Sequence, residues 1–339
     1  MKKDTWVFLR SAHEGKQERT GLAPSDSLSD CDDLWTYLFA MVVKKADVRG
    51  IVLRVGNPYV VNYGKDLIEF RSLDLNFPPG CESPDLIFNR GGYRDYLPYL
   101  NKHQDVPSVY IGCGRRWNPE DEKWSPWMKG VRRDLVLVDS ESQKRMLVQD
   151  HSEVFSKPAL DHLFWPEPVG KQFDLVFICH TPREIKGGKW LASRIPDGTS
   201  VLVVGPEDGW LRKESVSGRI RVRFTGKVPR RLVRHLACQA RVGVVCDDGK
   251  CDSGPRVLPE YLAMGIPVIV RECVRAHLPG YVTSETGIVV IDDPPDFGNA
   301  LRTLIELGKL GKLNPREVYW KKYRMNHAAD RLVRLVESL

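Results

Sequence analysis

Residues 251–270 read CDSGPRVLPEYLAMGIPVIV and pass from a turn through a helix into a strand. The Gly-Pro pair at 254–255 forms the turn, and the apolar run after it has helical spacing. Gly-Ile-Pro then ends the helix, and the β-branched residues at 266–270 predict a strand. Asp252 and Glu260 lie at the two ends of the turn, eight positions apart. The stretch therefore predicts a helix that leads directly into a buried strand, with two carboxylates near the start of the helix.

The same alternation of strand and helix runs through the whole chain. Short β-branched runs, several of them apolar at every position, are typical of parallel strands covered on both faces. Amphipathic stretches separate them, including residues 30–46, which run from acidic residues to lysines, and a capping box that starts at Ser140. Repeated this often, the alternation predicts an α/β fold with doubly wound parallel sheets. Strands are predicted at 5–10, 50–55, 85–89, 108–112, 134–139, 173–179, 200–205, 220–226, 241–246, 266–270 and 287–291.

Residues 157–172 interrupt the alternation. This segment carries three prolines and has neither a helical nor a strand period, which predicts a linker. It divides the chain into a first Rossmann-like domain at 1–160 and a second at 173–312. Residues 313–339 read as one or two helices that could pack back on the first domain. Ligands of such sheets bind outside the carboxyl ends of the strands, so we expect strand-to-helix loops to line a cleft between the domains.

The composition is that of a soluble globular protein with room for two cores. The 339 residues are 42% hydrophobic and 28% charged, and no apolar run approaches the roughly 20 residues that a membrane span needs. The first residues offer no signal-peptide core. Eight scattered cysteines, without metal-binding spacing, are typical of buried free thiols in a reducing compartment. We therefore expect a cytoplasmic protein without a metal site, and the net charge of +7 modestly favours an anionic partner.

Cations and glycines gather in the loops that follow strands in the second half. The segment HTPREIKGGKW places Arg183 and Lys186 just before paired glycines at the start of a helix. A lysine, a flexible backbone and free N–H groups are suited to hold a phosphate. Gly226, in VRFTGKVP, would let a second loop approach the same ligand closely. The alternative for the two cations is an ordinary solvated loop.

The carboxylates of the opening stretch carry a second hypothesis. Glu260 falls in the first turns of its helix, and Asp252 lies just outside it. Neither can attract a phosphate, but both can accept hydrogen bonds from vicinal hydroxyls, such as those of a ribose. The alternative is a carboxylate that complements the positive end of the helix dipole.

Residues 252–270 resemble the nucleotide-sugar motif of the group 1 GT-B glycosyltransferases, in which two acidic residues flank seven others before an Ala-x-Gly-x-Pro-Val strand entry. Asp252 and Glu260 match the two acidic positions. Residues 224–246, which begin with FTGKVP, resemble the element that precedes this motif.

The phosphate-binding element of the family is similar to ICHTPREIKGG, with Lys186 and Gly187 at matching positions. The family's arginine position, five before the lysine, holds Thr181, so Arg183 would have to replace that arginine. The resemblance covers residues 131–292.

This resemblance implies a fold, an activity and a set of site residues. The fold would be GT-B, with two Rossmann-like domains facing across a cleft, and members of this type usually retain the configuration of the sugar. The activity would be sugar transfer from a nucleoside diphosphate sugar, first of all a UDP-sugar, without a cofactor or an obligatory metal. Glu260 would bind the ribose, Asp252 would lie near the donor sugar, and Arg183 and Lys186 would neutralise the leaving diphosphate. The other donor-binding positions would be Gly226, Val228, Gly254, Pro255 and Arg256.

The acceptor would be bound mainly by the first domain, whose loops combine arginines with Tyr and Trp. The candidate acceptor-binding residues are His13, Arg90, Arg115 and Arg116, with Arg132 and Arg133 further along the same basic stretch. Such residues could follow a nucleic-acid strand, although ordinary loops with aromatic anchors are the simpler interpretation. FTGKVP also resembles a piece of the phage DNA glucosyltransferases, which makes a hydroxymethylated DNA base the second acceptor class. A non-catalytic GT-B protein that binds nucleotide is the remaining alternative.

Overall fold

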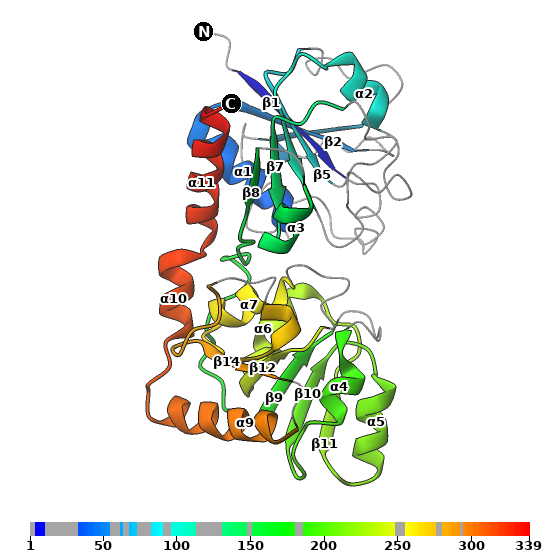
Figure 1. Cartoon of the computed structure of the whole chain (residues 1–339), viewed down its shortest axis with the longest axis vertical. Coiled ribbons are helices and arrows are strands. Elements are labelled where there is room, and N and C mark those ends of the chain that lie inside the picture. The colour runs from blue at the N-terminus through cyan, green and yellow to red at the C-terminus, as the bar shows by residue number, and fades with distance from the viewer. Residues whose placement is uncertain are drawn as a thin grey trace. The chain divides into compact units, whose positions relative to one another are not determined.

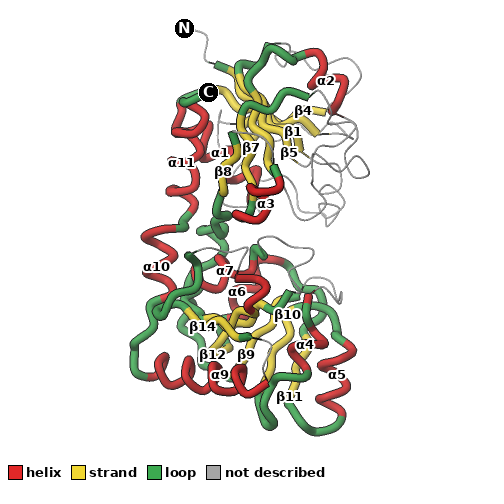
Figure 2. Tube along the Cα trace, viewed as in Figure 1, coloured by secondary structure: helices red, strands yellow, loops and turns green. Residues whose placement is uncertain are grey.

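The computed structural model describes residues 4–10, 33–54, 62–63, 68–72, 83–90, 96–112, 131–147, 151–179, 186–247, 255–275, 280–291 and 294–339. The chain forms two compact units, which Figures 1 and 2 draw. Unit 1 consists of Met1–Phe155 and Met325–Leu339, and unit 2 of Ser156–Arg324. Each unit is built on one mainly parallel sheet.

The sheet of unit 1 has the strand order β3-β4-β2-β1-β5-β6-β7-β8. All neighbouring strands are parallel except β3 and β4. The chain winds outward from β1 first in one direction and then in the other, so the order reverses between β1 and β5. The strands are β1 (Thr5–Arg10), β2 (Arg49–Arg54), β3 (Asn62–Tyr63), β4 (Ile68–Ser72), β5 (Leu86–Arg90), β6 (Ser108–Ile111), β7 (Leu135–Val138) and β8 (Ser152–Val154).

The helices of unit 1 come from both ends of the chain. Helix α1 (Leu34–Ala46) begins at Asp33, whose side chain accepts the Thr36 N–H at 2.8 Å, and α11 (Met325–Glu337) packs against α1. Lys45 of α1 forms an ion pair with Asp330 of α11, with Nζ and Oδ1 2.6 Å apart. The short helices α2 (Leu97–Lys102) and α3 (Glu141–Met146) complete the unit.

The sheet of unit 2 is parallel throughout, with the order β11-β10-β9-β12-β13-β14. This is the 3-2-1-4-5-6 order of a dinucleotide-binding fold, which reverses between β9 and β12. Burial of the apolar strands explains why these runs carry few polar residues. The strands are β9 (Phe173–Ile178), β10 (Ser200–Val204), β11 (Arg221–Phe224), β12 (Ala240–Val245), β13 (Val268–Arg271) and β14 (Gly287–Val290).

Helices cover both faces of this sheet. One face carries α4 (Gly188–Ala192), α5 (Gly209–Val216) and α9 (Pro294–Lys309), whose apolar residues share a core with alternate residues of the strands. The other helices of the unit are α6 (Arg230–Ala237), α7 (Val257–Ala263), α8 (Glu272–Arg275) and α10 (Pro315–Lys322). Helix α10 packs on α7, where Arg316 donates to the Ala263 carbonyl at 2.7 Å and so satisfies the carboxyl end of that helix.

The predicted strands and helices correspond closely to those of the structure. Each predicted strand has a counterpart, and Ser140 caps α3 by accepting the Gln143 N–H at 3.2 Å. Strands β3, β4 and β8 were not predicted, because β3 and β8 have only two and three residues and β4 mixes charged residues with apolar ones. Residues 157–172 form neither helix nor strand, as predicted, but they are tied to unit 2 by Glu167, which accepts from Arg234 of α6 at 2.5 Å.

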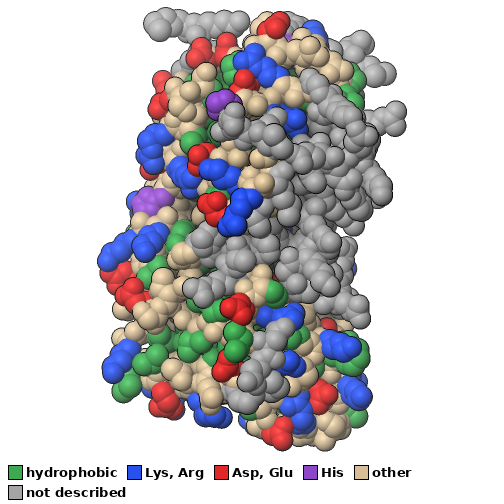
Figure 3. Space-filling view, viewed as in Figure 1, with side chains coloured by type: hydrophobic (Ala, Val, Ile, Leu, Met, Phe, Trp, Pro, Cys, Tyr) green, Lys and Arg blue, Asp and Glu red, His purple; other side chains and the backbone are tan. Residues whose placement is uncertain are grey.

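The described surface mixes charges of both signs. On the face drawn in Figure 3, Lys and Arg side chains are interspersed with Asp and Glu. None of the described helices combines the length and the apolar composition that a membrane span requires.

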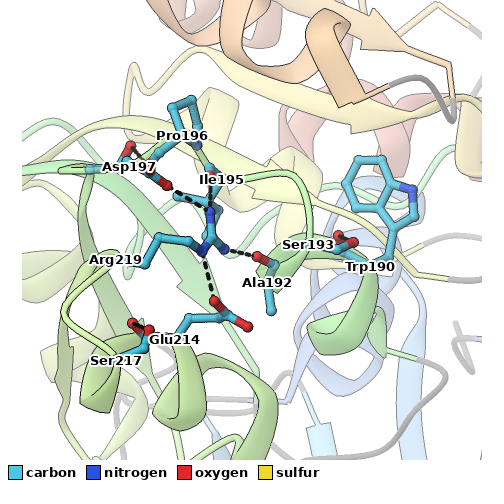
Figure 4. A network of polar contacts seen from close by, with 10 residues as sticks. Trp190, Ala192, Ser193, Ile195, Pro196, Asp197, Glu214, Ser217 and Arg219 are labelled. Atoms are coloured by element: carbon cyan, nitrogen blue, oxygen red, sulfur yellow. Dashed lines mark hydrogen bonds and ion pairs between the residues drawn. The ribbon is translucent and has the colours of Figure 1, made fainter.

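Arg219 fastens the carboxyl end of α4 to the segment that enters β11 (Figure 4). Its guanidinium donates to the carbonyl groups of Ala192 and Ile195 and forms an ion pair with Glu214, with Nε and Oε2 2.6 Å apart. Asp197 lies 3.3 Å from the same guanidinium. One side chain therefore satisfies carbonyl groups that the end of a helix leaves without intrahelical partners.

Candidate functional site

The strand order of unit 2 reverses at one point of its sheet, between β9 and β12. Strands β9 and β12 are neighbours, but the helices that follow them lead in opposite directions. Their ladder ends at the pair Val176 and Gly243, although β9 continues to Ile178 and β12 to Val245. The two carboxyl ends therefore separate, which is where open α/β sheets bind their ligands.

Tyr261 of α7 occupies the gap between the separating strands. Its hydroxyl donates to the Val176 carbonyl at 3.0 Å and accepts the Ile178 N–H at 3.1 Å, so it replaces the ladder bonds that β9 loses. The ring lies over Gly243, where a Cβ would be 2.8 Å from ring atoms. The side chain is fully buried, and this burial raises the pKa of the phenol well above its usual value. Tyr261 therefore joins α7 to the end of β9.

The loop after β9 returns to the sheet at Gly187 and Gly188. Gly187 has a φ of +77°, and a Cβ there would lie 1.9 Å from the Cys246 carbonyl oxygen. A Cβ on Gly188 would lie 2.1 Å from the carboxylate of Asp208, which caps α5 by accepting from Trp210 and Leu211. Because both positions exclude any side chain, Gly187 lets this loop lie directly against the end of β12, and Gly188 lets it lie against the start of α5.

Lys186, just before these glycines, points to the end of β12. Its Nζ lies 2.7 Å from Oδ1 of Asp247, the second residue after that strand. The Lys186 side chain is 26% exposed and that of Asp247 only 8%, so the lysine keeps access to solvent while the carboxylate does not. The predicted cation therefore lies at the reversal point of the sheet, together with an acidic residue that the sequence analysis did not single out.

Glu260 lies in α7 immediately before Tyr261. It is 8% exposed, and its Oε1 accepts from Nη2 of Arg230 at 2.6 Å. Arg230 begins α6, and its guanidinium also lies 5.6 Å from the ring centroid of Phe164. This ion pair connects the starts of α6 and α7, and a role for Glu260 limited to the helix dipole does not account for it.

Other predicted donor-binding positions lie in the loops of the same unit. Gly226 follows β11 with a φ of +68° and has open space where a Cβ would be, and Val228 is half-buried. Before α7, Pro255 is buried and Arg256 is exposed. Arg183, Asp252 and Gly254 lie outside the described residues.

The acceptor candidates of unit 1 are described only in part. Arg90 ends β5, with its guanidinium 5.6 Å from the ring centroid of Trp35. Arg132 forms an ion pair with Asp134 at 2.8 Å, and burial lowers the pKa of the Arg133 guanidinium. His13, Arg115 and Arg116 lie outside the described residues.

The cysteines near the site are buried thiols, as predicted. Cys179, Cys238 and Cys246 are free and buried, and Cys273 is free and half-buried. Burial raises the pKa of the Cys246 thiol well above its usual value, so this thiol stays protonated and unreactive at neutral pH.

Residues 172–307, which contain this site, match the family model described as Glycosyl transferases group 1. Comparison with curated proteins gave no match.

Solved structures resemble the chain over almost its entire length. Sucrose-phosphate synthase from Thermosynechococcus elongatus is 16% identical, with a TM-score of 0.71 over 99% of each chain. Anabaena HepE in complex with UDP is 12% identical, with a TM-score of 0.66 over 99% of this chain and 100% of that one. A T4 phage BGT mutant in complex with UDP-glucose is 13% identical, with a TM-score of 0.59 over 98% and 99%. The predicted GT-B fold, with two Rossmann-like units, is thereby confirmed.

Proposed function

We propose that this chain is a glycosyltransferase that moves a sugar from a nucleoside diphosphate sugar, with UDP-sugars as the first candidates, to a hydroxyl acceptor. The observation that carries the proposal is the position of Lys186 at the reversal point of the sheet in unit 2. The same unit matches the group 1 glycosyltransferases over residues 172–307. The complexes of HepE with UDP and of the T4 phage protein with UDP-glucose support a UDP-sugar as the donor.

In this proposal Lys186 acts on the leaving diphosphate. Negative charge grows on the phosphate oxygens as the glycosidic bond breaks, and a cation fixed nearby stabilises the transition state more than the ground state. The glycines that follow Lys186 hold its loop against the end of β12, so the cation is placed before the donor arrives. Arg183 would add a second cation, and no metal would be obligatory.

The carboxylates would bind the neutral parts of the donor. Glu260 can accept hydrogen bonds from the ribose hydroxyls while it remains paired with Arg230, because a carboxylate has several acceptor sites. The pair would also fix the direction of the carboxylate. Asp252 would lie near the donor sugar, and Gly226, Val228, Gly254, Pro255 and Arg256 would line the rest of the donor site.

We expect the acceptor to be bound mainly by unit 1. A hydroxymethylated DNA base has less support than another hydroxyl acceptor, because Arg132 is already paired with Asp134 and Arg133 is half-buried. DNA-binding proteins instead present clusters of cations that are open to phosphates. If the acceptor is DNA, the protein should retard a hydroxymethylated duplex in a gel-shift assay at low salt.

The test of the proposed function is a calorimetric titration with UDP, GDP and ADP, followed by a turnover assay. We expect one of the three, UDP first, to bind, and the corresponding glucose or N-acetylglucosamine donor to release it slowly through hydrolysis. Binding of all three nucleotides without release from any donor would favour a non-catalytic nucleotide-binding protein. Absence of binding by all three would refute the proposal.

A further inference from the structure

Asp247 lies in the candidate site, and the proposed mechanism gives it no role. Its side chain is buried, and its Oδ1 lies 2.7 Å from the Lys186 ammonium. The cation proposed to bind the diphosphate therefore already has an acidic partner. A buried carboxylate beside a site for an anion opposes binding of that anion, so its presence calls for an explanation.

The Asp247 backbone is held in place, whereas the Lys186 ammonium is carried at the end of a long side chain. Asp247 comes directly after Cys246, whose carbonyl is pressed against Gly187, and the Cys273 thiol donates to the Asp247 carbonyl with a separation of 3.3 Å. Lysine carries its charge on a flexible four-carbon stem and has three N–H donors. One ammonium can therefore hold the carboxylate and a phosphate oxygen together, which would leave the two anions about 5 Å apart.

We propose that Asp247 weakens binding of the product nucleoside diphosphate more than binding of the donor, and so promotes product release. This inference rests on the proposed function. In the donor the terminal phosphate is esterified, and in the free product it carries an additional ionisable oxygen with a pKa of about 6. Above that pH the product is more negative than the donor, so a fixed carboxylate repels it more strongly. Coulomb repulsion over about 5 Å at the edge of a protein is large enough to change an affinity about tenfold.

The experiment compares three ligands of increasing charge on the parent chain and on Asp247→Asn. The asparagine keeps the size of the side chain and one oxygen that can accept from Lys186. At pH 8 and low salt, we expect an unchanged affinity for uridine, measured by ligand-observed NMR. By calorimetry, UDP-glucose should bind a few-fold more tightly and UDP about tenfold more tightly.

A matched control, Asp174→Asn, removes the same charge near the amino ends of the strands, away from the candidate site. Asp174 lies in β9 near its amino end, where it accepts from the Ser200 N–H at 2.9 Å. We expect Asp174→Asn to bind all three ligands as the parent does. A general effect of lower negative charge on the whole protein would appear equally in both variants.

The possible outcomes separate this inference from the proposed function. UDP that binds the parent but binds Asp247→Asn equally or more weakly overturns the inference and leaves the proposed function standing. An equal gain for uridine and UDP also overturns it, because the variant would then have changed the shape of the site rather than its charge. Failure of both UDP and UDP-glucose to bind the parent overturns the UDP-sugar proposal and this inference together.

Discussion

Tyr261→Phe removes a single hydroxyl at the point where β9 and β12 separate. In the parent this hydroxyl is bonded to the Val176 carbonyl and the Ile178 N–H, at 3.0 and 3.1 Å, on a fully buried side chain. Phenylalanine would leave both backbone groups without that partner in a buried place, and each such group costs about 1–3 kcal/mol. Allowing for some relaxation, we expect the variant to lose about 2–4 kcal/mol of stability in unit 2.

The assay is amide hydrogen exchange followed by mass spectrometry on peptides that cover residues 173–179. Local opening at the end of β9 should raise exchange there by a factor that reports the lost stability directly. The matched control is Tyr281→Phe, which removes a hydroxyl that donates to the Lys157 carbonyl at 2.7 Å in the same unit. We expect this control to leave exchange at 173–179 unchanged.

Affinity for UDP provides the second measurement, because Tyr261 joins α7 to the strand that leads to Lys186. Affinity should fall in Tyr261→Phe and stay at the parent value in Tyr281→Phe. If Tyr261→Phe showed parent exchange at residues 173–179 together with parent affinity, the hydroxyl would not hold the separated strands. The account of how the site is positioned would then be refuted.

Three further substitutions test individual parts of the site. Lys186→Ala should lower turnover about 100-fold or more while UDP-sugar affinity falls less, because the charge that Lys186 stabilises grows in the transition state. A variant that binds the donor and turns it over at the parent rate would remove Lys186 from the mechanism. Glu260→Gln should weaken uridine and UDP by the same factor, since it loses charge-assisted bonds to the ribose and not to the phosphates; calorimetry showing parent affinity for both would reject that role. Gly187→Ala would place a Cβ 1.9 Å from the Cys246 carbonyl oxygen and should lower the thermal unfolding midpoint. Gly198 has the same φ of +77° but open space around it, so Gly198→Ala should lower the midpoint far less. Equal midpoints for the two variants would contradict the close approach.

Much of the fold could be predicted, because apolar β-branched runs and helix caps are local signals. Inner strands of unit 2 such as β10 are buried on both faces, so their sequences are almost continuously apolar and stand out, whereas the edge strand β11 alternates arginines with apolar residues. Lys186 could be placed at the carboxyl edge of the sheet for the same reason, since it follows a recognisable strand and precedes paired glycines. The short strand β8 could not be predicted, because its three residues carry no apolar pattern.

The partners of the site residues could not be predicted, because they depend on tertiary contacts. Asp247 follows a strand like many surface aspartates, and only the reversal of strand order brings it to Lys186. Arg230 belongs to a run of cations at the start of α6, and nothing in that run distinguishes the arginine that reaches Glu260. Gly243 and Tyr261 are far apart in sequence, so the contact of ring and glycine becomes visible only in the folded sheet.

The return of α11 to α1 makes unit 1 discontinuous in the chain and has a consequence for synthesis on the ribosome. Unit 2 is complete once residue 324 has emerged, whereas α1 still lacks the helix that packs on it. The buried side chains of α11, including Ala329 and Leu332, are translated about 290 residues after those of α1. The unit that begins first is therefore finished last. Until then α1 carries an apolar surface that chaperones can bind, and a nascent chain stalled before residue 325 should be recognised by them.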